Sequence, residues 1–242
     1  MDQPRSEIFI LDLRRAAGLI QKPTVWTSGV QLMNGETYAM VLRQADLWLT
    51  PKVVAQFDPT DFQMWDEGSR LALAERVAAF RRIAETVSPN KPATEEQYRA
   101  GLSALKQLVE QLGGMVLGEW ERALNRVTTE MESWCAAVNV SVRKEPKQVN
   151  EGLLGTYQTF QALLYFEQHL YLFDPLARFV PGAKGLIDLS IQPSFYVTSL
   201  YRGYDDGWFV TLDVGQGARG GRREPFSKDS FFAALKELRS LL

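Results

Sequence analysis

A glycine-rich loop near the C-terminal end is the first feature of this 242-residue sequence that could do chemistry. Its residues Gly215 to Gly220 fit the pattern G-x-G-x-x-G and follow a predicted strand. A dinucleotide site also needs a helix that opens at the glycines and a second, parallel strand. Pro225 and Ser227 delay the next helix here. The pattern therefore favours a flexible loop over a dinucleotide site.

The same loop carries three arginines, Arg219, Arg222 and Arg223. Glycine amides together with guanidinium groups can bind a phosphate-bearing ligand or a nucleic-acid backbone. The whole chain, however, has 27 Lys and Arg against 29 Asp and Glu, for a net charge of −2. A broadly basic nucleic-acid binder is disfavoured, and binding of an anion or nucleic acid at these arginines stays an alternative.

Carboxylates offer a second chemistry. Asp58 and Asp61 could share a divalent metal or act as an acid–base pair, although Asp-Pro-Thr-Asp is also a common turn sequence. Together with Glu130 and Glu132 they support the second alternative, a metal-dependent enzyme. We nevertheless predict no cofactor and no resident metal, because these carboxylates are scattered along the chain.

The one histidine and the one cysteine exclude several classes of site. A single histidine cannot form a two-histidine metal site, and a single cysteine cannot form an internal disulfide or a cysteine-based zinc site. His169 lies two residues from Glu167 on a predicted helix, so the two would point to different faces. Cys135, beside Trp134, is expected to be a buried and inert thiol.

Aromatic residues suggest a different role. Six tryptophans and 13 phenylalanines are ample for a core, and protein interfaces favour aromatic residues. We take Phe62, Trp65, Phe166 and Phe232 as candidate interface residues. The leading hypothesis is therefore a non-catalytic interaction module, such as an adaptor, a subunit of a complex or an inhibitor. Its partner would be another protein or a second copy of the chain.

The N-terminal part of the sequence is predicted to be β-rich. Asn34-Gly35 between two apolar runs, 30–33 and 37–42, is a strong signal for a β-hairpin, and 47–49 reads as a third strand. Thr50-Pro51 is typical of the start of a helix.

The middle of the sequence is predicted to be helical. An apolar stripe over 73–87 indicates one helix, and the capping-box pattern Thr94-Glu95-Glu96-Gln97 begins a second. Unbroken from 95 to 138, this helix would be about 66 Å long. A compact chain of this size has a radius of gyration of about 18 Å, so we expect a break near Gly113-Gly114. Apolar residues at helical spacing predict a further helix over 147–172.

The C-terminal part is predicted to contain strands at 186–191, 195–201 and 208–214, with a hairpin turn at Asp206-Gly207. Ser227 is expected to cap a final helix. The fold class that follows is α+β: a central helical bundle (51–175) flanked by an N-terminal β-meander (1–50) and a C-terminal antiparallel β-hairpin plus a final helix (176–242). The two β parts either pair into one sheet packed on the bundle, and so form one compact domain, or form separate small lobes. The N-terminal residues do not form a signal peptide pattern, and no apolar run reaches the length of a membrane span. A cytoplasmic protein that does not enter a membrane is expected.

Overall fold

The computed structural model describes residues 67–86, 94–151, 154–178, 180, 182–194, 196–203, 205–212 and 221–242. The chain divides into two compact units, Asp2–Glu119 and Trp120–Leu242, which are described separately below. The strands and the hairpin predicted within 1–50, and the helix start at Thr50-Pro51, lie outside the described residues. So does most of the glycine-rich loop.

The described part of the first unit contains one helix, α5, and the first part of another, α6, which continues into the second unit. Helix α5 spans Glu67–Thr86 and corresponds to the predicted apolar stripe. Helix α6 spans Glu95–Ala136 and begins where the capping box predicts. The backbone N–H of Thr94 donates to the side-chain oxygen of Gln97 at 3.0 Å, and the N–H of Gln97 donates to the Thr94 hydroxyl at 3.2 Å.

Contacts between the two helices give their direction. The side chain of Gln97 donates to the carbonyl of Thr86 at 2.9 Å, and Arg76 donates to the side chain of Gln107 at 2.7 Å. A residue late in α5 thus meets the start of α6, and an earlier residue of α5 meets a later one of α6. The two helices form an antiparallel hairpin.

The predicted break at Gly113-Gly114 is wrong, because α6 is one continuous helix through both glycines. A Cβ atom added at either glycine would meet nothing within 4 Å. Glycine costs a helix about 1 kcal/mol relative to alanine but removes no backbone hydrogen bond, so it need not end the helix. We expected a break because the unbroken helix is much longer than the radius of gyration of a compact chain of this size. That radius, however, sets no limit on the length of one helix.

Gly113→Ala and Gly114→Ala are each expected to raise the free energy of unfolding by up to about 1 kcal/mol. Alanine has the higher helix propensity, and the added methyl group finds open space. Urea unfolding followed by circular dichroism measures the change. A loss of stability in both variants would contradict an α6 that is helical through this point.

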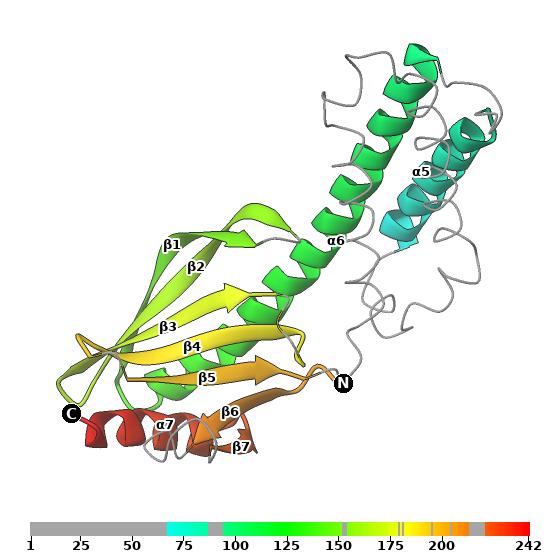
Figure 1. Ribbon diagram of the computed structural model, residues 1–242. Coiled ribbons are helices and arrows are strands. Elements are labelled where there is room, and N and C mark those ends of the chain that lie inside the picture. Colours follow the sequence, from blue (N-terminus) through cyan, green and yellow to red (C-terminus); the bar gives the residue numbers. More distant parts are fainter. Residues whose placement is uncertain are drawn as a thin grey trace. The chain divides into compact units, whose positions relative to one another are not determined.

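The second unit contains a seven-stranded antiparallel sheet among the described residues, in the order β1-β2-β3-β4-β5-β6-β7 (Figure 1). Every strand pairs with the one that follows it in the sequence, as in a meander. The strands are β1 Ser141–Glu151, β2 Gly155–Phe166, β3 His169–Ala177, β4 Gly185–Gln192, β5 Val197–Arg202, β6 Trp208–Leu212 and β7 Arg222–Pro225. Helix α7, Lys228–Ser240, follows the sheet.

The sheet overturns the predicted fold class, a central helical bundle flanked by β elements. Strands β1, β2 and β3 occupy the region in which a helix over 147–172 was predicted. The reason is that β2 and β3 carry apolar residues on both faces, and such a run resembles the stripe of a buried helix. The turn between β2 and β3 places Glu167 and Gln168 at positive φ, which no helix allows.

The strands and the helix predicted near the C-terminal end are present. Strands β4, β5 and β6 match the predicted ranges to within a few residues. Asp206 takes the left-handed conformation (φ 66°) in the turn between β5 and β6. Ser227 caps α7, and its side chain accepts a hydrogen bond from the N–H of Ser230.

Both helical segments of this unit pack on the same face of the sheet, which we call the inner face (Figure 1). On β4 the residues at every second position, Gly185, Ile187, Leu189 and Ile191, are buried. The part of α6 from Trp120 onward presents a buried stripe at helical spacing: Trp120, Ala123, Leu124, Val127, Met131 and Cys135. The hydroxyl of buried Tyr171 on β3 donates to the carbonyl of Leu235 on α7 at 3.1 Å.

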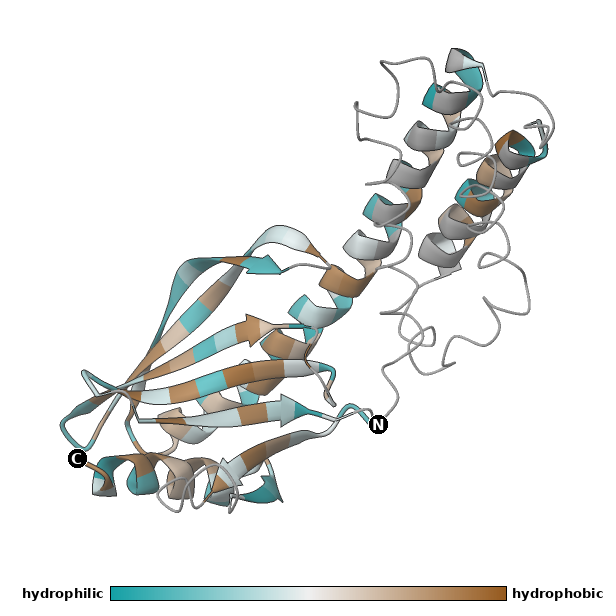
Figure 2. Ribbon diagram, viewed as in Figure 1, coloured by the Kyte–Doolittle hydropathy of each residue, from teal (hydrophilic) through white to brown (hydrophobic). Residues whose placement is uncertain are grey.

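The alternation along the strands is visible in the hydropathy colouring, where brown and teal positions follow one another (Figure 2). Aromatic rings close the ends of the inner layer. Trp120 lies 6.0 Å from Trp208 between ring centroids, and Trp134 lies 5.2 Å from Phe226 and 6.0 Å from Phe231. Within the described ranges, no helix is long and apolar enough to cross a membrane.

Candidate interaction surface

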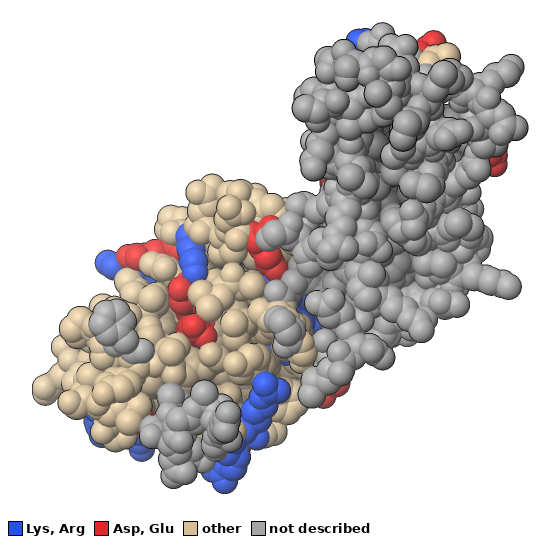
Figure 3. Space-filling model, viewed as in Figure 1, with Lys and Arg blue, Asp and Glu red and all other residues tan. Residues whose placement is uncertain are grey.

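The face of the sheet opposite α6 and α7, which we call the outer face, is not covered by any described helix. It is built from the positions that alternate with the buried ones. On β4 these are Leu186, Asp188, Ser190 and Gln192, all half-buried. Figure 3 views the molecule from this side and shows a mostly uncharged surface crossed by a few charged side chains.

An apolar patch occupies one end of the outer face. Its five residues come from three strands and are Leu163, Tyr165, Leu170, Leu172 and Val197. Tyr165 lies directly opposite Leu170 in the register of β2 and β3, and Leu163 lies opposite Leu172. Ser190 on β4 pairs with both Leu172 and Val197, so it joins the third strand to the patch.

The patch is exposed. Tyr165 keeps 59% of its surface accessible, Leu170 38% and Val197 37%. Leu163 and Leu172 are half-buried beside them. Scattered exposed apolar residues are normal, whereas a contiguous exposed group is a candidate site of interaction.

Polar side chains cross the outer face next to the patch. Asp174 on β3 pairs in register with Asp188 on β4, and Asp188 pairs with Ser199 on β5. The Lys147 ammonium on β1 contacts the Asp174 carboxylate and donates to the carbonyl of Pro175 at 3.0 Å. The Ser199 hydroxyl donates to Asp188 Oδ1 at 2.6 Å.

Within this group, the carboxyl group of Asp188 has a raised pKa. Burial raises the pKa of its carboxyl group, and the neighbouring Asp174 carboxylate raises it further. The hydrogen bond from Ser199 and the charge of Lys147 act in the opposite direction. A carboxylate with a raised pKa is one whose charge the surroundings do not fully compensate.

Asp188→Asn is expected to gain stability relative to the wild type as the pH rises from 3 to 7. The folded-state pKa of Asp188 lies above its unfolded value of about 3.8, so the native state binds this proton more tightly. Ionisation therefore costs stability over the interval between the two pKa values, and asparagine removes this cost while its oxygen still accepts from Ser199. Urea unfolding at several pH values measures the trend.

The matched control for loss of one negative charge is Glu130→Gln, which changes an exposed carboxylate on α6. If the stability of Asp188→Asn instead stays constant or falls relative to that of the wild type as the pH rises, the Asp188 carboxylate is well compensated.

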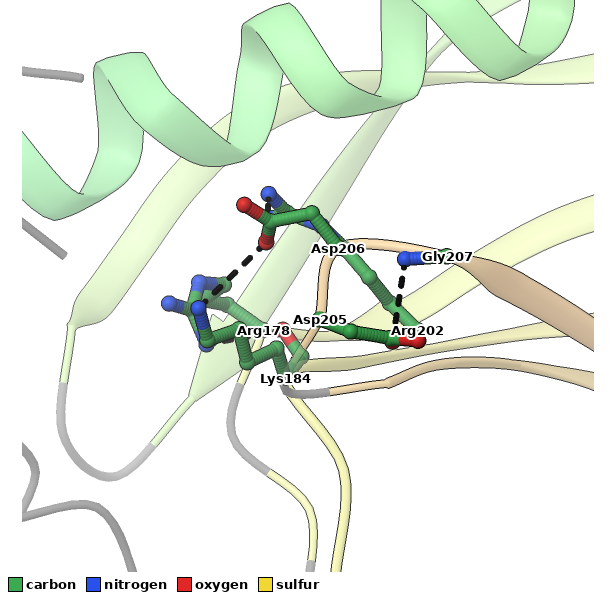
Figure 4. Close-up of polar contacts among 6 residues, drawn as sticks. All are labelled: Arg178, Lys184, Arg202, Asp205, Asp206 and Gly207. Carbon is green, nitrogen blue, oxygen red and sulfur yellow. Dashed lines mark hydrogen bonds and ion pairs between the residues drawn. The ribbon is translucent and has the colours of Figure 1, made fainter. Parts of the chain in front are cut away.

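A buried ionic cluster lies at the other end of the sheet, where β5 ends and β6 begins (Figure 4). Asp206 Oδ1 accepts from Arg202 Nη2 at 2.8 Å and lies 3.3 Å from Lys184 Nζ. The side chains of Lys184 and Arg202 are only 3% and 1% exposed. In the adjoining hairpin, Asp205 accepts a hydrogen bond from the N–H of Gly207 at 3.2 Å.

Arg178 extends this cluster toward β1. Its backbone N–H donates to Glu151 Oε2 at 3.0 Å, and its Nη1 donates to the carbonyl of Lys184 at 2.7 Å. The hydroxyl of Tyr157 donates to the same Glu151 oxygen at 3.1 Å. The cluster holds three buried cations, Arg178, Lys184 and Arg202, and two carboxylates, Glu151 and Asp206. Its hydrogen bonds and ion pairs join the ends of several strands.

The arginine loop is only partly described. Arg222 and Arg223 are consecutive residues of β7 and so point to opposite faces of the strand, while Arg219 lies outside the described residues. Arg222 pairs with Glu224 at 2.7 Å, and the guanidinium of Arg223 lies 4.5 Å from the centroid of the Tyr201 ring. The structure therefore does not bring these two guanidinium groups together.

Of the predicted interface residues, Phe166 and Phe232 contact each other, with ring centroids 5.5 Å apart, and tie the end of β2 to α7. Phe62 and Trp65 lie outside the described residues, as do Asp58 and Asp61. Glu132 pairs with Lys144 at 3.0 Å. Within the described part of the chain, no group of three or more His, Cys, Asp or Glu could hold a metal ion.

The helical context assumed for His169 is wrong, because His169 begins strand β3 and pairs in register with Phe166. Glu167 lies in the turn before it and forms an ion pair with Arg239 of α7. Cys135 is fully buried on α6. Burial, and to a smaller extent the charge of Glu132, raises the pKa of its thiol to about 11.

The outer-face residues are the ones that sequence reasoning missed. Residues 170–173 are apolar at every position, so they showed no alternation between two faces and were included in the predicted helix. A scan against models of protein families finds no match, and searches of curated proteins and of solved structures find no similar protein. A functional proposal for this chain therefore depends on its own surface chemistry.

Proposed function

We propose that this protein is a non-catalytic interaction module that binds a protein partner through the outer face of its sheet. The observation that carries the proposal is the apolar patch. Three of its members, Tyr165, Leu170 and Val197, are exposed and adjacent on neighbouring strands. Leaving such a group in water is costly, and covering it with a partner recovers free energy at about 25 cal/mol per Å² of apolar surface.

The edges of the sheet support docking on the face rather than addition of a strand. The edge strand β1 contains Lys144, Pro146 and Lys147. Charged residues and proline on an edge strand oppose pairing with another chain. The other edge, β7, is only four residues long. A cytoplasmic location is part of the same proposal, because a lone reduced thiol suits a reducing compartment.

Affinity purification of the tagged full chain from its native cells, with quantitative mass spectrometry, tests the proposal. Leu170→Asp is the patch variant, and Leu242→Asp is the control, since Leu242 is 60% exposed and lies outside the patch. We expect a defined partner that is lost from Leu170→Asp and retained by Leu242→Asp, with circular dichroism showing that both variants are folded. Identical recovery of proteins by both variants and the wild type would refute the proposal.

A further inference from the structure

The carboxylates of the outer face are not all paired with a cation. Its carboxylates on β1, β3 and β4 are Glu145, Asp174 and Asp188. Glu145 is paired with Arg143 at 2.5 Å, and Asp174 is paired with Lys147. Among the described residues, Asp188 accepts a hydrogen bond only from a neutral hydroxyl, that of Ser199.

Lys147 compensates the charge of Asp188 only in part, and the surroundings of Asp188 add to the cost of that charge. The side chain is half-buried, and the carboxylate opposite it in register, Asp174, has the same sign. Like charges directly opposite on neighbouring strands destabilise each other. A cation brought to Asp188 by a partner would form a charge-assisted hydrogen bond, which is about twice as strong as a neutral one.

Asp188 also borders the apolar patch. Ser190, which joins Leu172 to Val197, is two residues from Asp188 on the same face of β4, a step of about 7 Å along a strand. A bound segment can therefore cover the patch with apolar side chains while one of its basic side chains reaches Asp188.

We infer that the partner presents to the outer face a protein segment in which a lysine or arginine lies within a few residues of large apolar side chains. The apolar side chains cover Leu170, Leu172 and Val197, and the basic side chain pairs with Asp188. The inference rests on the proposed function and adds to it the chemistry of the partner. The apolar contact supplies affinity, and the ion pair selects the segment, as charge complementarity does at other interfaces.

Selection from a random 12-residue peptide library displayed on phage, with the full-length protein as bait, tests the inference. We expect enrichment of peptides that combine Lys or Arg with Leu, Ile, Val or aromatic residues. A selected peptide, synthesised with a fluorescent label, is then titrated with each variant by fluorescence anisotropy. Asp188→Asn is expected to bind about tenfold more weakly, and the control Glu130→Gln within twofold of the wild type.

A double-mutant cycle separates the ion pair from a general loss of binding. Replacing the basic residue of the peptide by glutamine should weaken binding to the wild type about tenfold but cause little further loss with Asp188→Asn. Equal losses with both proteins would mean that the cation does not meet Asp188 and would overturn the inference.

Two other outcomes have different meanings. Peptides that bind in a patch-dependent way but show no preference for basic residues would overturn the inference and leave the proposed function standing. Self-association that Leu170→Asp abolishes in light scattering, with no peptide enriched, would assign the face to a second copy of the chain. That outcome would also overturn the inference.

Discussion

Trp120→Ala is expected to lower the free energy of unfolding by about 3–5 kcal/mol, as truncation of a large buried aromatic side chain does. Trp120 is completely buried on α6, and its ring lies 6.0 Å from that of Trp208. It also fits against Gly185 at the start of β4, where a Cβ atom would come within 2.4 Å and 2.8 Å of two ring carbons. The ring thus packs α6 against the start of β4 and against Trp208.

The close approach of Trp120 to Gly185 allows a second test of the same contact. Gly185→Ala should also destabilise the protein, because the methyl group cannot occupy the space of the ring without a shift of β4 or of Trp120. The double variant Trp120→Ala, Gly185→Ala should lose less than the sum of the two single losses, since the methyl group then enters the vacated space. Chemical denaturation of all four proteins measures the coupling, and strict additivity would mean that the two residues do not meet.

Asp206→Asn is the second large change, with an expected loss of about 2–4 kcal/mol. Its carboxylate contacts two cations whose side chains are almost fully buried, Lys184 and Arg202. Removal of one partner from a buried ion pair leaves uncompensated charge in a poorly solvated site, which is strongly destabilising. Asp206 itself is 30% exposed, so the expected loss is below that of a fully buried pair.

The choice of asparagine isolates the charge. Asp206 has φ of 66°, a conformation that asparagine adopts readily, so the backbone of the turn is retained. Asp205→Asn is the matched control, because Asp205 is exposed in the same turn and accepts its hydrogen bond from a backbone N–H. Equilibrium unfolding of both variants should show a large loss only for Asp206→Asn. Equal losses would indicate that the turn, and not the charge, holds the strand ends.

Local sequence patterns predicted the starts of two helices and one turn. The capping box at Thr94 and Gln97 begins α6, and Ser227 begins α7, because their side chains satisfy the free N–H groups of a helix start. The turn at Asp206 and Gly207 was recognisable from residues that tolerate positive φ. These features need no knowledge of distant parts of the chain.

The region 147–172 was mispredicted for a physical reason. Val149, Tyr157, Phe160 and Leu164 follow one another at distances that suit a helix, but they lie on β1 and β2. A strand with one face against a core and the other in an apolar patch has no clean alternation. The pairing of β2 with β3 and of β3 with β4 makes this region form strands, and this pairing cannot be read from the local propensities of the residues.

The candidate site depended even more on tertiary structure. The sequence by itself determined the residue types: one histidine, one cysteine, nearly balanced charge, and the local starts of helices and turns. Only the sheet register placed Tyr165 beside Leu170 and Asp174 opposite Asp188. These positions are set by hydrogen bonding between strands and by burial of the inner face under α6 and α7, which are properties of the folded unit and not of any segment.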